Sequence, residues 1–353
     1  MQTPLIRPTE RGLWVEAGGF YIDPWEPVDR AVVTHAHADH CRWGCGRYLC
    51  STEGEPVLRQ RVQPDALVQT LPFGDPLTVG DATVSLHPAG HLLGSAQVCV
   101  EVGGRREVSS GDYKLEPDPT CTPWEPVACD RFITESTFGL PIYRWPDADH
   151  VAADMIGWWR DNQAAGRTSV MLGYALGKSQ RVLNMMLGAV GGDPADLPGR
   201  IVAHGAVRKF VEVYRQVGRA VPPVLPGTAE TRDLVRGKGL VIAPPSTLGT
   251  PWLNRYKPFG TAFASGWMMV RGNRRRRGVD RGFVVSDHVD WPGLHAALEV
   301  TGCSEVGVTH GYVDQVVRHL RELGVTAEVV PTHFEAREDD AGAAERDDAS
   351  EPV

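Results

Sequence analysis

Three histidines and an aspartate lie within six residues, in the segment His35-Ala36-His37-Ala38-Asp39-His40. The segment directly follows AVVT, an apolar run that predicts a β-strand. Alternate positions of extended chain project to the same side, so these side chains can converge where the strand becomes a loop. Imidazole and carboxylate groups suit zinc and related divalent ions. Surface histidines are the alternative, but they rarely cluster in this way, and we therefore predict a metal site.

Further candidate ligands end other predicted strands. His91 lies in HPAGH after TVSL, Asp112 lies in SSGDYK after REV, and His310 lies in VGVTHGY. Each is next to a glycine, where the backbone can bend a side chain into a common pocket. A structural role is an equal alternative for each residue alone, but together they favour one pocket.

The pattern of elements changes along the 353 residues, which are enough for about two domains. Short β-type runs separated by turn residues fill the first third. From about Asp149, helical periodicities alternate with strand-like runs, as in a parallel α/β unit. Strands and helices alternate again after an arginine run, and the chain closes on acidic, weakly hydrophobic residues.

The order HxHxDH, GH, SGD and THG resembles the metallo-β-lactamase fold. This resemblance implies an α/β protein with an αββα sandwich and two divalent metal ions, Zn²⁺ or Mn²⁺. The residues that correspond to the family's ligands would form two sets that share a bridging aspartate. The first set is His35, His37, His91 and Asp112, the second is Asp39, His40 and His310, and Asp112 bridges.

An earlier aspartate, Asp23 in FYIDP, matches the family's residue that orients a ligand histidine from behind. A turn-forming aspartate before Pro24 is the alternative of equal weight.

Two later motifs resemble motifs A and B of the β-CASP branch, whose members are nucleases. They are residues 135–139, ESTFG, and residues 286–290, SDHVD, with His310 as motif C. The resemblance implies a metallo-β-lactamase domain in two parts, 1–138 and 269–334, around a short inserted β-CASP α/β domain, 139–268. Residues 335–353 would form an acidic disordered tail.

The segments RAVVTHAHADHCRWG, VSSGDYKLEPDPTC, TESTFGLPIYRWP, GYALGKSQR and VVSDHVDWPGL resemble the bacterial ligase-associated DNA exonuclease family, over nearly the whole chain to about Phe334. This resemblance implies a 5′-to-3′ exonuclease in DNA repair, with endonuclease action on single strands as a further activity. It also implies DNA rather than RNA as substrate, and a ligase and a helicase as functional partners. An RNA 3′-end-processing nuclease of the same fold is the alternative.

By the same resemblance, His288 would be the general acid, Glu135 would orient its imidazole, and Asp39 would serve catalysis through the metal. Two rival readings are an inactive β-CASP scaffold, which would be expected to have lost ligands, and a small-molecule hydrolase. Glu135, His288 and the inserted domain argue against the hydrolase.

Two basic segments are candidates for substrate contact. GYALGKS lacks the spacing of an ATP-binding Walker loop, but Lys178, Ser179 and Arg181 open a helix that can hold a phosphate. The second segment is the run Arg274, Arg275, Arg276 and Arg277. Solvated charges are the alternative for both.

Charge and cysteine content limit the class of protein. The net charge of −8 argues against nucleic acid, but residues 335–353 carry −6 of it, and two divalent ions would bring the remaining −2 to about +2. Neither a signal peptide nor a membrane span is evident, which predicts a cytoplasmic protein. Cys41, Cys45 and Cys50 lack a CxxC pair and are predicted to be packed thiols, with a zinc site as the weaker alternative.

Overall fold

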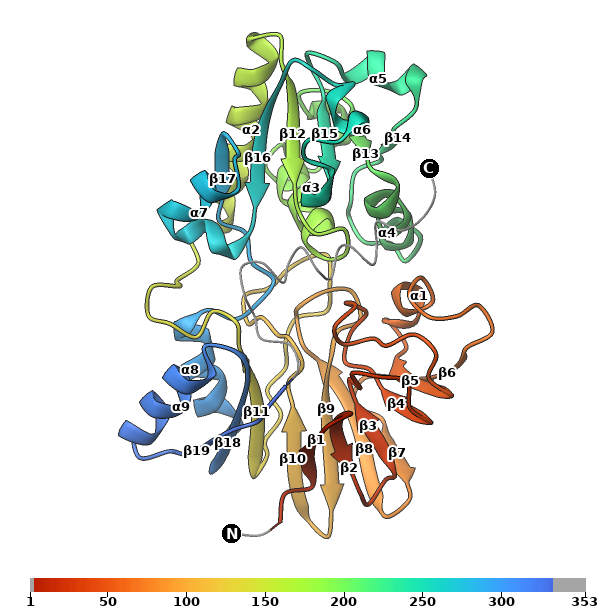
Figure 1. The fold of residues 1–353 in the computed structure, drawn as a ribbon, viewed down its shortest axis with the longest axis vertical. Coiled ribbons are helices and arrows are strands. Elements are labelled where there is room, and N and C mark those ends of the chain that lie inside the picture. The colour runs from red at the N-terminus through yellow and green to blue at the C-terminus, as the bar shows by residue number, and fades with distance from the viewer. Residues whose placement is uncertain (1–2, 333–353) are drawn as a thin grey trace. The chain divides into compact units, whose positions relative to one another are not determined.

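The structure is a computed structural model that describes residues 3–332. The described residues form two compact units (Figure 1): one joins residues 3–144 to residues 288–332, and the other spans Trp145–Asp287. The predicted acidic tail, 335–353, lies outside the described residues.

The first unit contains two β-sheets. The six-stranded sheet has its strands in sequence order: β1 (Ile6–Thr9), β2 (Gly12–Val15), β3 (Phe20–Ile22), β4 (Arg30–Val32), β5 (Arg47–Ser51) and β6 (Leu67–Leu71). The seven-stranded sheet has the order β19 (Thr326–Val329), β18 (Glu305–Gly311), β11 (Arg131–Ser136), β10 (Arg105–Ser109), β9 (Ala96–Val102), β8 (Ala82–Pro88) and β7 (Pro76–Val79). Each sheet combines antiparallel and parallel pairs.

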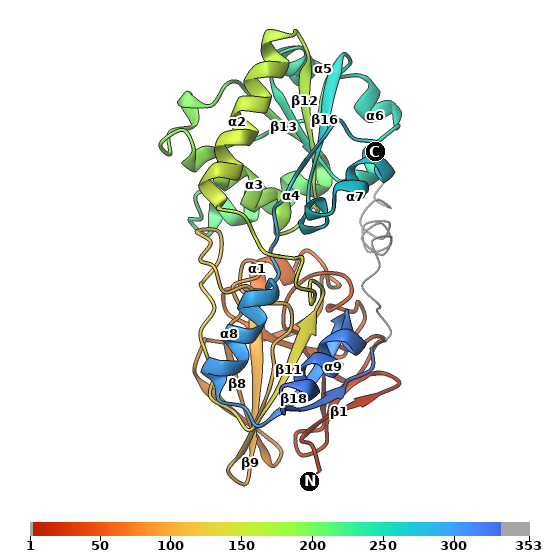
Figure 2. The same cartoon turned by 90° about the vertical axis from the view of Figure 1, so that its left-hand side faces the viewer.

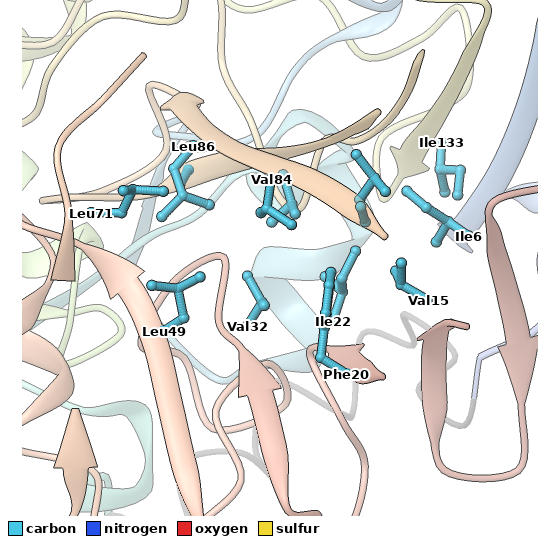
Figure 3. Close-up of a cluster of buried hydrophobic side chains, with 14 of the residues drawn as sticks. Ile6, Val15, Phe20, Ile22, Val32, Leu49, Leu71, Val84, Leu86 and Ile133 are labelled. Atoms are coloured by element: carbon cyan, nitrogen blue, oxygen red, sulfur yellow. The ribbon is translucent and has the colours of Figure 1, made fainter. Parts of the chain in front are cut away.

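The two sheets pack face to face over one apolar core. In β8, Val84 and Leu86 are buried while the residues between them are partly exposed, which is the period-two pattern of a half-covered strand. Figure 3 shows these side chains facing Val32 and Leu49 of the other sheet. Each such side chain contributes about 1.5–3 kcal/mol when fully buried, so this core holds the sheets together.

Helices cover the outer face of the larger sheet. α8 (Trp291–Thr301) and α9 (Val313–Glu322) bury Leu294, Val316 and Leu320 against it. The short helix α1 (Glu55–Leu58) packs against the smaller sheet, and cysteine side chains belong to the same buried cluster. Cys41, Cys45 and Cys50 are free and buried there, as predicted.

The second unit is a parallel sheet with helices around it. Its strand order is β14 (Leu225–Pro226), β13 (Ile201–Ala203), β15 (Leu240–Ala243), β12 (Thr168–Leu172), β16 (Phe259–Ala264) and β17 (Arg281–Phe283). Its helices are α2 (Ala148–Ala164), α3 (Lys178–Gly188), α4 (Gly205–Gln216), α5 (Ala229–Val235), α6 (Pro251–Asn254) and α7 (Arg271–Arg276). Figure 2 shows α2 and α6 on opposite sides of the sheet.

The unit boundary differs from the predicted domain boundary at residue 268. Residues 269–287, predicted to belong to the second part of the metallo-β-lactamase domain, lie in the same compact unit as residues 145–268, and the predicted domain bounds stay a prediction. The reason is that β17 pairs in parallel with β16, a long-range contact that no local pattern indicates.

No helix within residues 3–332 is long and apolar enough to span a bilayer.

Candidate metal centre and active site

The first predicted ligand set converges in the first unit. His35, His37, His91 and Asp112 each place a ligand-type atom within 4.8 Å of the others. His37 Nδ1 lies 3.1 Å from His35 Nε2 and 3.2 Å from His91 Nε2. The Asp112 carboxylate lies 3.5 Å from His35 Nε2. These residues follow β4, β8 and β10, so the ends of three strands bring them together.

The second predicted set also meets Asp112, and it does so at Oδ2, the carboxylate oxygen that lies closest to His35 as well. His40 Nε2 is 3.6 Å from the Asp39 carboxylate and 3.5 Å from the Asp112 carboxylate. The ring of His310 stacks on that of His40 with centroids 5.3 Å apart. All four residues line a cavity of about 30 Å³, so Asp112 faces both sets.

The donor atoms of this cluster fit a divalent cation. His40 Nε2 is buried and has no hydrogen-bond partner among the described residues. A buried imidazole nitrogen without a partner is costly, and a cation between it and two carboxylates would satisfy it. The mixture of imidazole and carboxylate ligands is one that zinc and manganese accept.

The electrostatics of the cluster reflect its burial. Burial raises the pKa of Asp112 to about 7 against the opposing charge of His40. Burial, with the neighbouring His40 charge, lowers the pKa of His310 to about 4. Burial also holds the pKa of His35 well below its usual value, so that imidazole stays neutral, the form that binds metals.

Asp23 lies behind the second set and contacts it directly. Its Oδ2 accepts hydrogen bonds from His40 Nδ1 at 2.7 Å and from Thr34 Oγ1 at 2.6 Å, and its Oδ1 accepts from the Thr34 backbone N–H at 2.8 Å. A fixed Nδ1 directs the opposite ring nitrogen of His40 into the cavity. The sequence patterns do not single out Thr34, although its place between AVV and His35 is a usable signal.

The backbone around this cluster takes unusual conformations. Asp23 and His310 have φ of +44° and +49° and are the non-glycine residues with positive φ in the described chain. Such conformations cost about 1–3 kcal/mol and concentrate at functional sites. Gly111, beside Asp112, has φ of +54°, and a Cβ there would lie 2.7 Å from Thr34 Cβ, so the SGD turn requires glycine.

His288 and Glu135 form a pair beside the first set. His288 Nδ1 lies 3.0 and 2.9 Å from the two carboxylate oxygens of Glu135, and Tyr113 donates its backbone N–H to Glu135 Oε1 at 3.0 Å. Burial alone would raise the pKa of Glu135, but His288 outweighs it and lowers that pKa. The carboxylate therefore stays ionised. The His288 ring centroid is 4.8 Å from that of His91.

The predicted phosphate contacts at the start of α3 lie inside the second unit. Lys178 and Arg181 are 2% and 4% exposed. Lys178 Nζ donates to the Val285 carbonyl at 3.1 Å and to the Asp287 carboxylate, and Arg181 donates to the Ser286 carbonyl. These cations hold residues 285–287 in place. Both cations are thus engaged within the unit, and their contact with substrate stays a prediction.

Ser179, the third residue predicted there, is fully buried. Its Oγ donates to the Tyr174 carbonyl at 2.7 Å, which closes the turn before α3.

The arginine run forms the helix α7 and divides by role. Arg276 donates to Asn273 Oδ1, and the Arg277 guanidinium lies 4.7 Å from the Phe263 ring centroid. Arg275 is exposed and lines a cavity. Substrate contact by the four arginines stays a prediction, and the side chain of Arg274 lies outside what the structure describes.

No family model matches the chain. A protein of Opitutus terrae named as a probable DNA ligase is 33% identical over 319 residues, which are 90% of this chain and 30% of the relative. An endoribonuclease of Aspergillus fumigatus is 33% identical over 120 residues, 33% of this chain and 14% of the relative. A ribonuclease of Thermus thermophilus is 31% identical over 147 residues, 34% of each chain. This chain thus spans about a third or less of these relatives.

A solved structure supports the fold alone. It is a protein of unknown function from Enterococcus faecalis, with a TM-score of 0.55, 12% sequence identity, and coverage of 87% of this chain and 80% of that chain.

The two-sheet unit, the His–Asp cluster and these relatives define a metallo-β-lactamase-fold protein of the β-CASP branch. Within that branch, the match over 90% of its length to the probable DNA ligase confirms the predicted resemblance to the ligase-associated group.

Proposed function

We propose that this protein is a metal-dependent nuclease that hydrolyses phosphodiester bonds. The observation that carries the proposal is the juxtaposition of the buried His–Asp cluster with the His288–Glu135 pair, since His288 Nδ1 lies 3.9 Å from the Asp112 carboxylate. A cation site beside an imidazole held by a carboxylate combines charge stabilisation with proton donation, the two needs of phosphodiester hydrolysis.

Seven side chains would hold two divalent ions, in the two sets described above. They are His35, His37, His91, Asp112, Asp39, His40 and His310. The bound ions would supply Lewis acidity, which activates water and neutralises charge on the phosphoryl oxygens. Imidazole ligands favour zinc, whereas the carboxylates also accept manganese.

His288 would protonate the leaving 3′-oxygen. The ionised Glu135 carboxylate beside Nδ1 stabilises the protonated imidazole, and it fixes the ring so that Nε2 is the nitrogen directed at substrate. Glu135 is itself held by the Tyr113 backbone N–H, so the pair is set before substrate arrives.

DNA is the substrate that we propose, with exonuclease action from a 5′ end and endonuclease action on single strands. The support is the similarity over 90% of the chain to a probable DNA ligase. The same similarity supports a role in DNA repair with a ligase as functional partner, and the ligase-associated resemblance adds a helicase. RNA processing is the second candidate, because relatives named endoribonuclease and ribonuclease match about a third of the chain.

One experiment tests both the activity and the substrate. The metal-stripped protein is given Zn²⁺, Mn²⁺ or Mg²⁺, and its hydrolysis of DNA and RNA strands of one sequence, labelled at either end, is followed side by side. We expect metal-dependent cleavage, faster on DNA, with mononucleotides released from the 5′ end. Faster RNA cleavage would replace the substrate, and no cleavage with any ion would refute the function.

A further inference from the structure

A cavity of about 540 Å³ lies in the second unit, beside α7 and β17. Three arginines, two glycines and a methionine line it: Met268, Arg271, Gly272, Arg275, Arg281 and Gly282. It is named the arginine cavity after these residues. Its volume lies within the range of ligand pockets, about 300–1,000 Å³.

The arginine cavity carries excess positive charge. Arg271 and Arg275 are exposed, stand four residues apart on α7, and their side chains form no hydrogen bond or ion pair with other described residues. Arg281 bonds Asp154 at 3.1 Å. Three guanidinium groups thus meet one carboxylate, and an anion in the cavity would relieve their repulsion.

The lining favours phosphate over base recognition. Guanidinium groups pair bidentately with phosphate oxygens. Among the described residues, no aromatic side chain lines the cavity, so these residues offer no ring on which a base can stack. The other described arginines of the run are engaged elsewhere, Arg276 with Asn273 and Arg277 with the Phe263 ring.

We propose that the arginine cavity binds the phosphodiester backbone of a single-stranded nucleic acid, independently of base sequence, through Arg271, Arg275 and Arg281. The proposal rests on the proposed function for the nature of the ligand. A site of about 540 Å³ matches pockets that enclose a drug-sized ligand, so we infer that it takes a short part of one strand rather than a duplex.

Fluorescence anisotropy tests the site, with labelled oligothymidylate and oligouridylate as probes over a series of salt concentrations. The variant is Arg271→Gln/Arg275→Gln. The matched control is Arg160→Gln/Arg167→Gln, which removes two exposed arginines from the same unit that do not line the cavity. Both pairs are on the surface, so both proteins should unfold at the wild-type temperature.

We expect the cavity variant to bind both probes more weakly, by about tenfold or more. The plot of log affinity against log salt should become shallower by about 1.4 in slope, because two phosphate contacts are lost. The control should match wild type. An unchanged slope, an equal loss in the control, or a loss on only one probe would overturn the proposal.

Hydrolysis of bis(p-nitrophenyl) phosphate, a substrate with one phosphodiester and no nucleic-acid strand, separates this proposal from the nuclease function. If wild type cleaves it and the variant binds strands normally, the cavity proposal fails alone. If wild type cleaves nothing but the variant loses strand binding, the cavity stands and the nuclease function fails.

Discussion

The carboxylate of Asp23 accepts a hydrogen bond of 2.7 Å from His40 Nδ1, and the opposite nitrogen of that ring faces the small cavity shared with Asp39 and Asp112. Thr34 holds the same carboxylate through both its backbone N–H and its hydroxyl. Asp23 therefore sets the direction of a predicted ligand while contributing no ligand itself.

Asp23→Ala should weaken the binding of the second metal ion by about 10- to 100-fold, because His40 loses the acceptor that orients it. Competition titration with a zinc chelator measures this. The control is Asp29→Ala, which removes an exposed carboxylate from the loop between β3 and β4. Equal metal affinity in both variants would show that Asp23 only forms a turn.

His288→Ala should lower kcat by about 10²- to 10⁴-fold while metal content and strand binding stay at wild-type levels. Glu135→Gln should lower kcat in the same direction, since a neutral amide does not stabilise the protonated imidazole. Single-turnover cleavage with elemental analysis of each protein measures this. Full activity in His288→Ala would remove it from the mechanism.

Gly111→Ala should destabilise the first unit and reduce its metal content, because the added Cβ would lie 2.7 Å from Thr34 Cβ and displace the neighbouring Asp112. Gly103→Ala is a matched control, since it has a similar φ of +58° but no atom within 4 Å of the new Cβ. We expect the control to cost about 1 kcal/mol and to keep its metal. Thermal unfolding and elemental analysis distinguish the two.

Lys178→Met should destabilise the second unit by about 3–5 kcal/mol, because it leaves Asp287 buried without this cation. Urea unfolding measures the loss, and Lys238→Met, at an exposed lysine, is the control. The double variant Lys178→Met/Asp287→Leu should recover most of the stability. A harmless single variant would show that Lys178 is not needed to hold residues 285–287.

His295, on α8, should lower the free energy of unfolding in mild acid. Burial and the nearby His319 lower the pKa of His295 below its unfolded value of about 6.5. As the pH falls through that value, the unfolded chain gains a proton that the folded chain resists, so the free energy of unfolding falls. His295→Phe should reduce this loss between about pH 7.5 and about pH 5.5, as urea unfolding would measure. An identical loss in both proteins would contradict the expectation.

Much of the fold and most of the candidate metal cluster followed from local patterns. The elements predicted around HAHADH, SGD and THG are present as β4, β10 and β18, because strand periodicity and glycine turns are encoded in neighbouring residues. Six of the predicted ligands lie around the seventh, Asp112, because His310 lies near the end of β18 and the others follow β4, β8 and β10. Their role as ligands stays a prediction.

Tertiary structure alone decided the roles of the basic residues and the division of the chain. Lys178 and Arg181 look like phosphate contacts from their place at a helix start, but their partners lie more than a hundred residues away, at 285–287. Arg271 and Arg281 drew no attention in the sequence, yet they share a cavity with Arg275 because α7 lies beside β17. Local sequence determines which element a residue enters, whereas long-range packing determines whether its charge is buried or offered to a ligand.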